Sequence, residues 1–299
     1  MIKIANAPCS WGVLEFELEG KAPDYIQVLN EIKETGYEGT ELGDWGFMPT
    51  DPGALKAELA KRQLTMLGAF VPVLLKDKSK HADGIQTAIK TADLMRAAGY
   101  CDSFIVLADN NGTIPVRTKN AGRITPEMGL TNDEWKIFAE GATELARRVK
   151  DATGVRTVFH HHCGGYVETP REVETLMQQT DPELVGLVLD MGHYMFGGGD
   201  PLQALKQYSK RIWHVHFKDC DNRVAASSRT NGWDYFESVR NGVFCELGKG
   251  SVDFRSIVDE LQRQQYNGWI VVEQDVLPGM GKPKECAQNN RNFIKSLGL

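Results

Sequence analysis

Titratable side chains gather at the end of an apolar run in residues 213–219, WHVHFKD. His214 and His216 stand two residues apart, so they would point to the same face of a strand, and Lys218 continues that alternation. Imidazole and ammonium groups held together in this way can bind a metal ion or transfer protons. One such strand end carries little weight, because polar residues often cap strands in solvent, but similar ends recur along the chain.

Other predicted strand ends carry the same residue types. Their motifs are YEGTELGDWG, VRTVFHHHCGG, VGLVLDMGHY and WIVVEQD, and six of the seven histidines lie between positions 160 and 216. Asp190, His216 and Glu273 would supply a carboxylate, an imidazole and a carboxylate from adjacent strand ends, and His160 can complete the set. Such ligands suit a divalent cation, and we expect Mn²⁺ or Co²⁺, with Mg²⁺ or Fe²⁺ as alternatives. A structural zinc site favours thiolates and fits less well.

The strands that must position these groups alternate with helix-period segments along almost the whole chain. A glycine often follows such a segment, as at Gly36 and Gly154, which is typical of a helix C-terminus. Eight strand–helix pairs in 299 residues favour an α/β fold of the (β/α)8 type, a single TIM-barrel domain over residues 1–299. A doubly wound sheet is the alternative, but no GxGxxG follows the first strand. The expected strands are Lys3–Ala7, Tyr37–Leu42, Leu64–Phe70, Ser103–Leu107, Val155–His160, Val185–Asp190, Ile212–Phe217 and Trp269–Glu273.

Two insertions interrupt the alternation, residues 109–130 after the fourth strand and residues 220–250 after the seventh. Both would leave the carboxyl ends of their strands, which is the side on which TIM-barrel active sites form. Long loops without periodicity are often functional in that position. We therefore expect both insertions to cover the mouth of the barrel.

Composition narrows the class of partner. The chain is 41% hydrophobic and 25% charged, with a formal net charge of -6 and no dense lysine and arginine run, which gives no support to a nucleic-acid or membrane partner. No window approaches the length of an apolar membrane span, and the first residues lack a signal-peptide core. The six cysteines are scattered without a CxxC pair, which predicts free thiols in a cytoplasmic protein. The number of subunits stays open, with a homo-oligomer as one option.

Taken together, these motifs resemble the xylose isomerase-like TIM-barrel superfamily of sugar isomerases, epimerases and dehydratases. Within it the chain is most similar to the inosose dehydratases of inositol catabolism. The resemblance implies metal ligands at Asp190, His216 and Glu273, and a further ligand on the fifth strand. That ligand is a glutamate in the family's epimerases and corresponds here to His160 or a neighbouring histidine. The matching segments run along nearly the full length: NAPCSWG, GYEGTELGDWGF, LTNDEWKIFAEG, FHHHCGGYVETP, LVLDMGHY, HVHFKD, ELGKGSVDF and VVEQDV.

The missing glutamate bears on the reaction. An epimerase of this family resembles a two-base enzyme with carboxylates on opposite faces of the substrate, so the loss favours proton abstraction on one side followed by elimination. The resemblance therefore implies a metal-dependent hydro-lyase that removes water from a small cyclic polyhydroxy ketone, a keto-inositol. A keto-sugar isomerase or epimerase on the same scaffold is the alternative. The density of titratable strand ends disfavours a non-catalytic sugar-binding barrel, and the acidic charge disfavours a DNA-repair endonuclease.

Roles for single residues follow from that reaction. The cation would act as a Lewis acid on the carbonyl group. Lys218 would remove the adjacent proton if the metal and the histidines lower its pKa, and His162 or His193 would protonate the departing hydroxyl group. Alternatively, Lys218 forms only a surface ion pair with Asp219. If Lys218 is catalytic, we expect Asp219 to fix the lysine or an adjacent loop. The expected substrate contacts are Glu41, Trp11 and Trp45 as an apolar wall, and Glu246, which alternatively orients the loop after the seventh strand.

Three further histidines receive other roles. His214 lies one inward step below His216, so we expect it to support the metal ligands by hydrogen bonding. His161 alternates away from His160, and we expect it to pack or to act in the same supporting way. His81, in KDKSKHADG, is expected to be a solvated loop residue.

Overall fold

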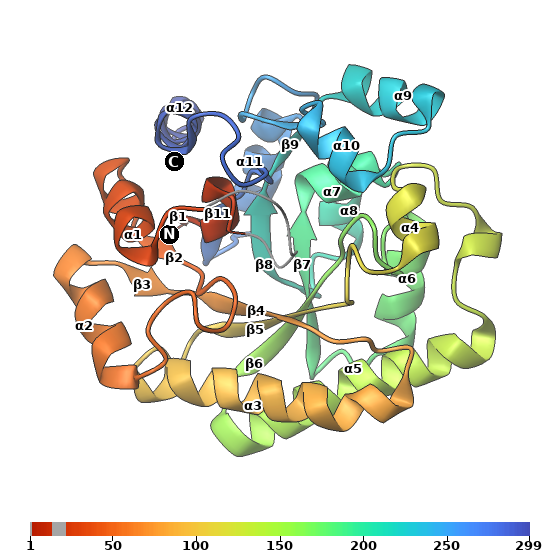
Figure 1. Cartoon of the computed structure of the whole chain (residues 1–299), viewed down its shortest axis with the longest axis horizontal. Coiled ribbons are helices and arrows are strands. Elements are labelled where there is room, and N and C mark those ends of the chain that lie inside the picture. The colour runs from red at the N-terminus through yellow and green to blue at the C-terminus, as the bar shows by residue number, and fades with distance from the viewer. Residues whose placement is uncertain (1, 14–21) are drawn as a thin grey trace.

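A parallel barrel forms the centre of the molecule (Figure 1). The computed structural model describes residues 2–13 and 22–299. The strands run in the order β3-β2-β1-β11-β8-β7-β6-β5-β4, and neighbours pair in parallel. Only Leu67 separates β3 from β4, so the two ends of this order meet in one barrel strand, and the predicted TIM barrel is confirmed. The strands are β1 (Lys3–Asn6), β2 (Gly39–Thr40), β3 (Thr65–Met66), β4 (Gly68–Pro72), β5 (Phe104–Ala108), β6 (Arg156–His160), β7 (Val185–Asp190), β8 (Ile212–Phe217) and β11 (Trp269–Val272).

Seven of the predicted strands match these bounds closely, while the second is shorter than expected. Regular strand geometry covers only Gly39–Thr40. Backbone hydrogen bonds from the Glu38 N–H to the Ile4 carbonyl (3.0 Å) and from the Leu42 N–H to the Gly68 carbonyl (2.9 Å) continue the pairing on either side. The second strand is therefore irregular, but it still occupies its place in the ring.

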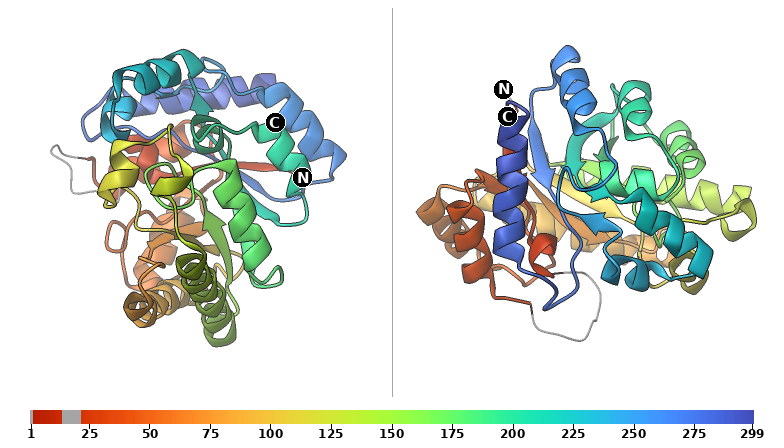
Figure 2. Two further views of the ribbon diagram at one scale, coloured as in Figure 1. Left: turned by 90° about the vertical axis from the view of Figure 1, so that its right-hand side faces the viewer. Right: turned by 90° about the horizontal axis from the view of Figure 1, so that it is seen from above.

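Helices pack around the outside of the barrel (Figures 1 and 2). The side chains of Thr131 and Glu134 form a capping box at the start of α5, and Thr169 and Glu172 form another at α6. α5 ends at Gly154, whose φ of 77° costs a glycine little. The helices are α1 (Tyr25–Glu34), α2 (Pro52–Arg62), α3 (His81–Ala97), α5 (Asn132–Thr153), α6 (Pro170–Gln179), α7 (Met191–Phe196), α8 (Pro201–Gln207), α11 (Phe254–Arg263) and α12 (Pro283–Ser296).

Both insertions contain structure of their own and contact each other. The segment 109–130 holds α4 (Pro115–Lys119), and the segment 220–250 holds α9 (Asn222–Asn231) and α10 (Tyr235–Arg240). β9 (Asp219–Cys220) and β10 (Phe244–Cys245) pair in antiparallel fashion at the base of the second insertion. The Arg123 guanidinium donates to the Trp233 carbonyl at 2.7 Å, and Arg229 donates to the Gly122 carbonyl at 3.2 Å. The two insertions thus form one connected wall.

His81 has a structural role that differs from the one predicted. His81 is not a solvated loop residue: it begins α3, and its Nε2 lies 2.7 Å from the Leu75 carbonyl oxygen. Its ring occupies the space that a side chain at Gly141 would need, so the glycine on α5 allows this close packing.

All six cysteines are free thiols, as predicted. Among the described residues, no helix is both long enough and apolar enough to span a bilayer.

Candidate active site

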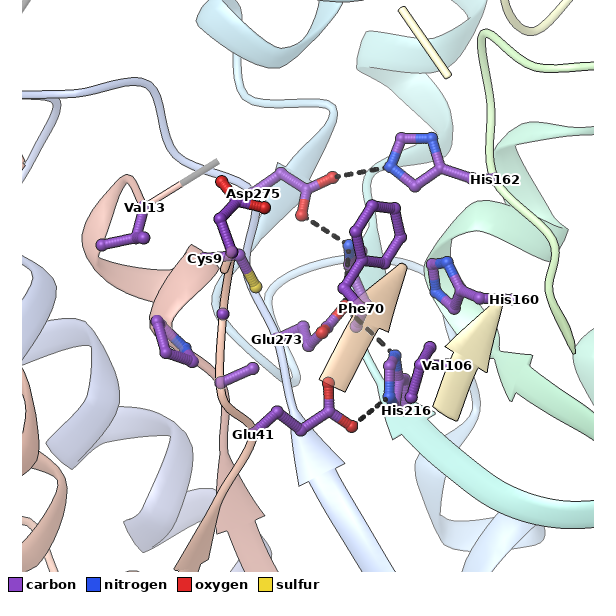
Figure 3. A pocket seen from close by; sticks show the side chains of 15 residues that line it. Cys9, Val13, Glu41, Phe70, Val106, His160, His162, His216, Glu273 and Asp275 are labelled. Atoms are coloured by element: carbon purple, nitrogen blue, oxygen red, sulfur yellow. Dashed lines mark hydrogen bonds and ion pairs between the residues drawn. The ribbon is translucent and has the colours of Figure 1, made fainter. Parts of the chain in front are cut away.

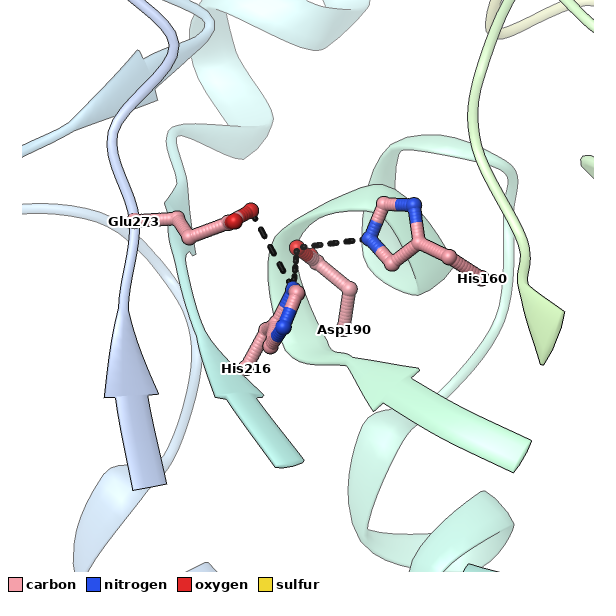
Figure 4. Close-up of side chains that lie close together, drawn as sticks. All are labelled: His160, Asp190, His216 and Glu273. Carbon is pink, nitrogen blue, oxygen red and sulfur yellow. Dashed lines mark ion pairs between the residues drawn. The ribbon is translucent and has the colours of Figure 1, made fainter. Parts of the chain in front are cut away.

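Four side chains from neighbouring strands meet at the carboxyl end of the barrel (Figure 4). The register sets Asp190 of β7 beside His216 of β8, Glu273 directly follows β11, and His160 ends β6. From Asp190 Oδ2, His160 Nε2 lies 3.7 Å away and His216 Nδ1 lies 3.9 Å away. His216 Nδ1 also lies 3.2 Å from Glu273 Oε2. One ligand atom of each residue lies within 4.8 Å of the others, so the structure brings the four predicted ligands together.

The polar atoms of this four-residue cluster fit a divalent cation. Asp190 Oδ2, His216 Nδ1 and both ring nitrogens of His160 are buried and have no hydrogen-bond partner among the described residues. Burying such atoms unpaired costs free energy, which coordination of a cation would offset. The other Asp190 oxygen accepts a hydrogen bond from the His193 backbone N–H at 2.8 Å, so the first turn of α7 orients the carboxylate. Two imidazoles and two carboxylates form a mixed nitrogen and oxygen donor set that could hold a divalent cation.

Glu41 connects this cluster to a second histidine. Its Oε1 lies 2.8 Å from His214 Nε2 and 3.1 Å from His216 Nε2. A neutral His216 that donates from Nε2 keeps the Nδ1 lone pair, which faces Asp190 and Glu273. Burial alone would raise the pKa of Glu41, but the two imidazoles hold this pKa below its usual range. Glu41 lines the cavity, but its carboxylate is directed at histidines, and His214 reaches the cluster through it.

Gly68 makes room for that contact. A Cβ at this position would lie 2.9 Å from Val106 Cγ2 and 3.4 Å from Glu41 Oε1. A side chain at this position would therefore clash with Val106 and come into contact with the Glu41 carboxylate.

Lys218 is buried among carboxylates. Its Nζ lies 2.6 Å from Asp275 Oδ1, 3.2 Å from Glu273 Oε2 and 3.6 Å from Asp190 Oδ2. Burial would lower the pKa of Lys218, but these three carboxylates raise it well above its ordinary value. These carboxylates therefore oppose the lowering of the pKa that was expected from a metal ion and the histidines. The surface ion pair with Asp219 is wrong, because Lys218 is only 1% exposed.

Asp275 is the centre of a second group of polar side chains, which sequence reasoning did not single out. Besides Lys218, it faces His193, with 3.3 Å between His193 Nε2 and Asp275 Oδ2, and His162, with 4.0 Å between His162 Nε2 and Oδ2. The rings of His162 and His193 contact each other in a tilted arrangement with centroids 3.9 Å apart, and burial lowers the pKa of both. The structure thus brings the three predicted proton-transfer residues together around one carboxylate. The position of Asp275 two residues after Glu273 could have identified it from the sequence.

Tyr235 was also missed. It begins α10 in the second insertion, and its hydroxyl donates to Asp275 Oδ2 at 2.8 Å. The ring is 2% exposed and lies against His162, with centroids 5.4 Å apart. Neither periodicity nor a motif in residues 220–250 pointed to this residue, because its contact depends on how the insertion folds back over the barrel.

These groups open into one cavity (Figure 3). Its enclosed volume is about 50 Å³, below the range of about 300–1,000 Å³ that is usual for small-molecule sites. Its walls are polar on one side and apolar on the other, where Phe70 and Val106 project from β4 and β5. The described lining residues are Ala7, Pro8, Cys9, Val13, Glu41, Gly43, Asp44, Phe70, Val106, His160, His162, His216, Lys218, Glu273 and Asp275.

The two tryptophans expected to form the apolar wall lie elsewhere. Trp11 is 1% exposed and donates from Nε1 to Glu31 Oε2 at 2.6 Å, which directs its ring toward α1. Trp45 is 38% exposed and lies under the Lys90 ammonium, 4.0 Å from the ring centroid. Neither is among the lining residues of the cavity. The prediction failed because a tryptophan near a strand end can face either the barrel interior or the surrounding helices.

Three further residues with predicted roles hold neighbouring segments in place rather than line the cavity. Glu246 pairs with Lys249 at 2.5 Å and accepts a hydrogen bond from Asn289 of α12, which agrees with the loop-orienting alternative. Asp219 accepts hydrogen bonds from the backbone N–H groups of residues 220, 248, 250 and 252, and so fixes the adjacent loop. His161 accepts a hydrogen bond from the Asp190 backbone N–H at 3.2 Å, the supporting role that was expected.

Comparison with known proteins agrees with this geometry. A family model described as xylose isomerase-like TIM barrel matches residues 29–297. The chain is 32% identical to an inosose dehydratase of Geobacillus kaustophilus (strain HTA426) over 99% of this chain and 94% of the relative. It is 33% identical to an inosose dehydratase of Salmonella typhimurium (strain LT2) over 99% of this chain and 96% of the relative.

Solved structures share the fold at lower sequence identity. The crystal structure of a probable 3-DHS dehydratase involved in petrobactin synthesis in Bacillus anthracis superimposes with a TM-score of 0.68. The match covers 99% of each chain at 14% identity, so it supports the architecture alone. Together with the full-length relatives, the site geometry leads to one assignment: the chain belongs to the inosose dehydratases, hydro-lyases of the xylose isomerase-like TIM barrel family.

Proposed function

We propose that this protein is a metal-dependent dehydratase that removes water from a keto-inositol in inositol catabolism. The observation that carries the proposal is the position of the Lys218 ammonium 3.2 Å from Glu273, at the edge of the four-residue cluster and inside the same cavity. We propose Mn²⁺ or Co²⁺ as the cation, with Mg²⁺ or Fe²⁺ as alternatives, held by His160, Asp190, His216 and Glu273. The names of the curated relatives support the keto-inositol substrate.

The proposed reaction breaks one C–H bond and one C–O bond. When bound, the cation supplies Lewis-acid polarisation of the substrate carbonyl group. Lys218 Nζ lies 3.0 Å from His193 Nε2. A cation held by the four-residue cluster would offset the charge of Asp190 and Glu273, two of the carboxylates that raise the pKa of Lys218, and would so favour transfer of one lysine proton to His193. That transfer leaves an amine as the base and an imidazolium as the acid. The amine takes the proton beside the carbonyl, and the electrons of that bond form the double bond as the β-hydroxyl departs. His193, or His162 beside it, gives that hydroxyl a proton, and water leaves.

The alternative, a keto-sugar isomerase or epimerase, is less well supported by the arrangement of groups. An epimerase needs proton-transfer groups on both faces of its substrate. Here Lys218, His162, His193 and Asp275 lie on one side of the cavity. β4 and β5, which stand across the ring from β8 and β11, offer Phe70 and Val106 instead. A one-sided set of proton-transfer groups favours elimination.

A product analysis by mass tests the proposal. The protein, loaded separately with each candidate cation, is incubated with a panel of inososes and keto-sugars. A dehydratase yields a product lighter by one water, whereas an isomerase or epimerase yields a product of unchanged mass. Turnover without loss of water would exclude the proposed reaction, and binding without turnover under every metal would favour a non-catalytic barrel.

The cellular setting is also a proposal. We propose that the protein works in the cytoplasm on a small molecule, because its six cysteines are free thiols, the state that a reducing compartment maintains. Fractionation followed by thiol labelling tests this: cysteines that are oxidised in freshly opened cells would contradict it.

A further inference from the structure

The position of Asp275 in the cavity depends on its side-chain contacts. It lies in the irregular segment after β11, so no strand or helix hydrogen bonding fixes its backbone. Nevertheless its side chain is directed inward and is 4% exposed. Oδ1 receives the Lys218 ammonium at 2.6 Å, and Oδ2 receives the Tyr235 hydroxyl at 2.8 Å. The two oxygens thus connect the lysine to a side chain of the second insertion.

The position of the Lys218 ammonium matters because other carboxylates compete for it. Glu273 Oε2 at 3.2 Å and Asp190 Oδ2 at 3.6 Å also attract Nζ, and both residues belong to the four-residue cluster. A lysine side chain has four rotatable bonds, so its ammonium follows whichever carboxylate is nearest and best aligned. Asp275, at 2.6 Å, keeps Nζ beside His193 and at the cavity wall. If the Asp275 carboxylate rotated, the ammonium would be free to move toward the cluster.

Tyr235 is well placed to prevent that rotation. Asp234 caps α10 by accepting a hydrogen bond from the Glu237 N–H at 2.7 Å, which fixes the first turn that carries the ring. The Ser238 hydroxyl meets the Ser228 hydroxyl at 2.7 Å and joins α10 to α9. The apolar residues of the insertion pack with Phe196 of α7, next to His193. The hydroxyl of Tyr235 is therefore presented by a packed element rather than by a mobile loop.

We propose that Tyr235 is a positioning residue, which holds Lys218 in place for proton abstraction by fixing the Asp275 carboxylate. The proposal rests on the dehydratase function proposed above and deepens it by giving the second insertion a part in the chemistry. Tyr235 acts through Asp275 and not on the substrate. Its loss should therefore change the rate of the chemical step more than the binding of the ketone.

The test compares two tyrosine-to-phenylalanine variants of the metal-loaded protein. Tyr235→Phe removes the hydroxyl and keeps the ring against His162. Tyr37→Phe is the matched control, since Tyr37 is also buried (1% exposed) and donates to the Ala287 carbonyl at 2.9 Å, on the outer side of the barrel. Tyr235→Phe should lower kcat about 10- to 100-fold, the size expected for a lost hydrogen bond to a charged group, with KM and metal content unchanged. Tyr37→Phe should leave kcat unchanged.

A second readout follows the lysine without any substrate. The rate at which a small amine-reactive reagent acylates Lys218 is measured by peptide mass spectrometry in both variants and in the unmodified protein. Release of the Asp275 carboxylate should raise this rate several-fold in Tyr235→Phe and leave it unchanged in Tyr37→Phe.

The two readouts separate the two proposals. An unchanged acylation rate in Tyr235→Phe would overturn the positioning role, whatever happens to kcat. A raised rate in a protein that dehydrates none of the ketones would leave the positioning role standing and overturn the dehydratase function.

Discussion

The two halves of the barrel mouth differ in almost every chemical respect. The ends of β6, β7, β8 and β11 carry imidazoles, carboxylates and an ammonium, several of which are buried without a full set of partners. β4 and β5 carry Phe70 and Val106 in the middle of the strand, and these side chains line the same cavity and offer only van der Waals contact. A ketone held between them would meet reactive groups on one face and a passive wall on the other. The difference indicates that one half performs the chemistry and the other half limits what fits.

Glu41 is a polar residue on the apolar side of the barrel mouth that contacts residues of the polar side. It follows β2, on the side of the ring away from β6 and β7, yet its carboxylate reaches His214 and His216. The polar half is therefore supported from across the barrel, and a change on the passive side can weaken it at that one point. The predictions below test this division, beginning with the changes expected to have the largest effect.

Removing a carboxylate from the four-residue cluster should abolish both metal binding and turnover. In Asp190→Ala or Glu273→Ala, three donors remain and the charge that balances the cation is reduced, so elemental analysis should find little metal in either purified variant. Asp93→Ala is the control, because Asp93 pairs only with Arg96 on the exposed face of α3. Full retention of metal in both cluster variants would mean that the polar half has another function.

Truncating the lysine should separate catalysis from metal binding. Lys218→Ala should keep its metal, because the four donors remain, and kcat should fall by about 10²- to 10⁴-fold, the usual contribution of a general base. The control Lys136→Ala removes an exposed lysine that pairs with Asp133. Normal turnover in Lys218→Ala would transfer the role of the base to His162 or His193.

The support that Glu41 gives from across the barrel should be measurable as metal affinity. His214→Ala should weaken metal binding by about 10- to 100-fold, as losses of supporting hydrogen bonds to a metal-binding histidine usually do. Since His214 reaches His216 through Glu41, Glu41→Gln should have a similar effect, and the double variant should be little worse than either single one. Titration calorimetry gives the affinities, with His81→Ala as a histidine control outside the site. Additive losses in the double variant would show that the two residues act separately.

The passive wall should affect substrate binding rather than chemistry. Phe70→Ala enlarges the cavity opposite Lys218, so KM should rise about tenfold with kcat nearly unchanged, a size typical of lost apolar contact in a pocket. Val106→Ala removes less surface and should have a smaller effect. Steady-state kinetics with the ketone that is turned over best provides both constants. If Phe70→Ala lowered kcat as strongly as Lys218→Ala, the division between the halves would have to be abandoned.

The smallest expected effect concerns the two insertions, whose backbone amides should become better protected from hydrogen exchange when substrate binds. We expect substrate binding to slow amide exchange in residues 109–130 or 220–250, because Arg123 and Arg229 join these segments and Tyr235 of the second one contacts Asp275 of the cavity. Hydrogen-exchange mass spectrometry with and without ketone measures this. Equal protection in both states would argue against a covering role.

The polar half was predictable from the sequence and the passive half was not. His160, Asp190, His216 and Glu273 follow apolar strands, and a parallel barrel places such strand ends together, so sequence order alone predicted their meeting. An apolar residue that faces the cavity from within a strand, such as Phe70 of β4, has no such signature, because its sequence pattern is that of any other core residue. For the same reason Trp11 was assigned to the cavity although it packs toward α1.

Contacts that depend on insertions or on charge were harder still. Tyr235 reaches Asp275 only because α9 and α10 fold back over the barrel, and no period in the sequence encodes that path. The carboxylates that raise the pKa of Lys218 were not foreseen, because their number around Nζ depends on side-chain geometry. The strand pattern in the sequence predicted where these groups lie, but their pKa values depend on distances between side chains.

The parallel pairing of β1 with β11 has a consequence for how the protein is made. Asn6 pairs with Val272, so the second neighbour of the first strand is the last barrel strand to leave the ribosome. Until then, one edge of β1 and one edge of β8 stay unpaired, and Glu273 and Asp275, which follow β11, are not yet beside His216 and Lys218. A nascent chain stalled before residue 269 would therefore carry most of the barrel with two open sheet edges and an incomplete site. Such edges bind other strands readily, so the interval before β11 emerges is when this chain most needs a chaperone.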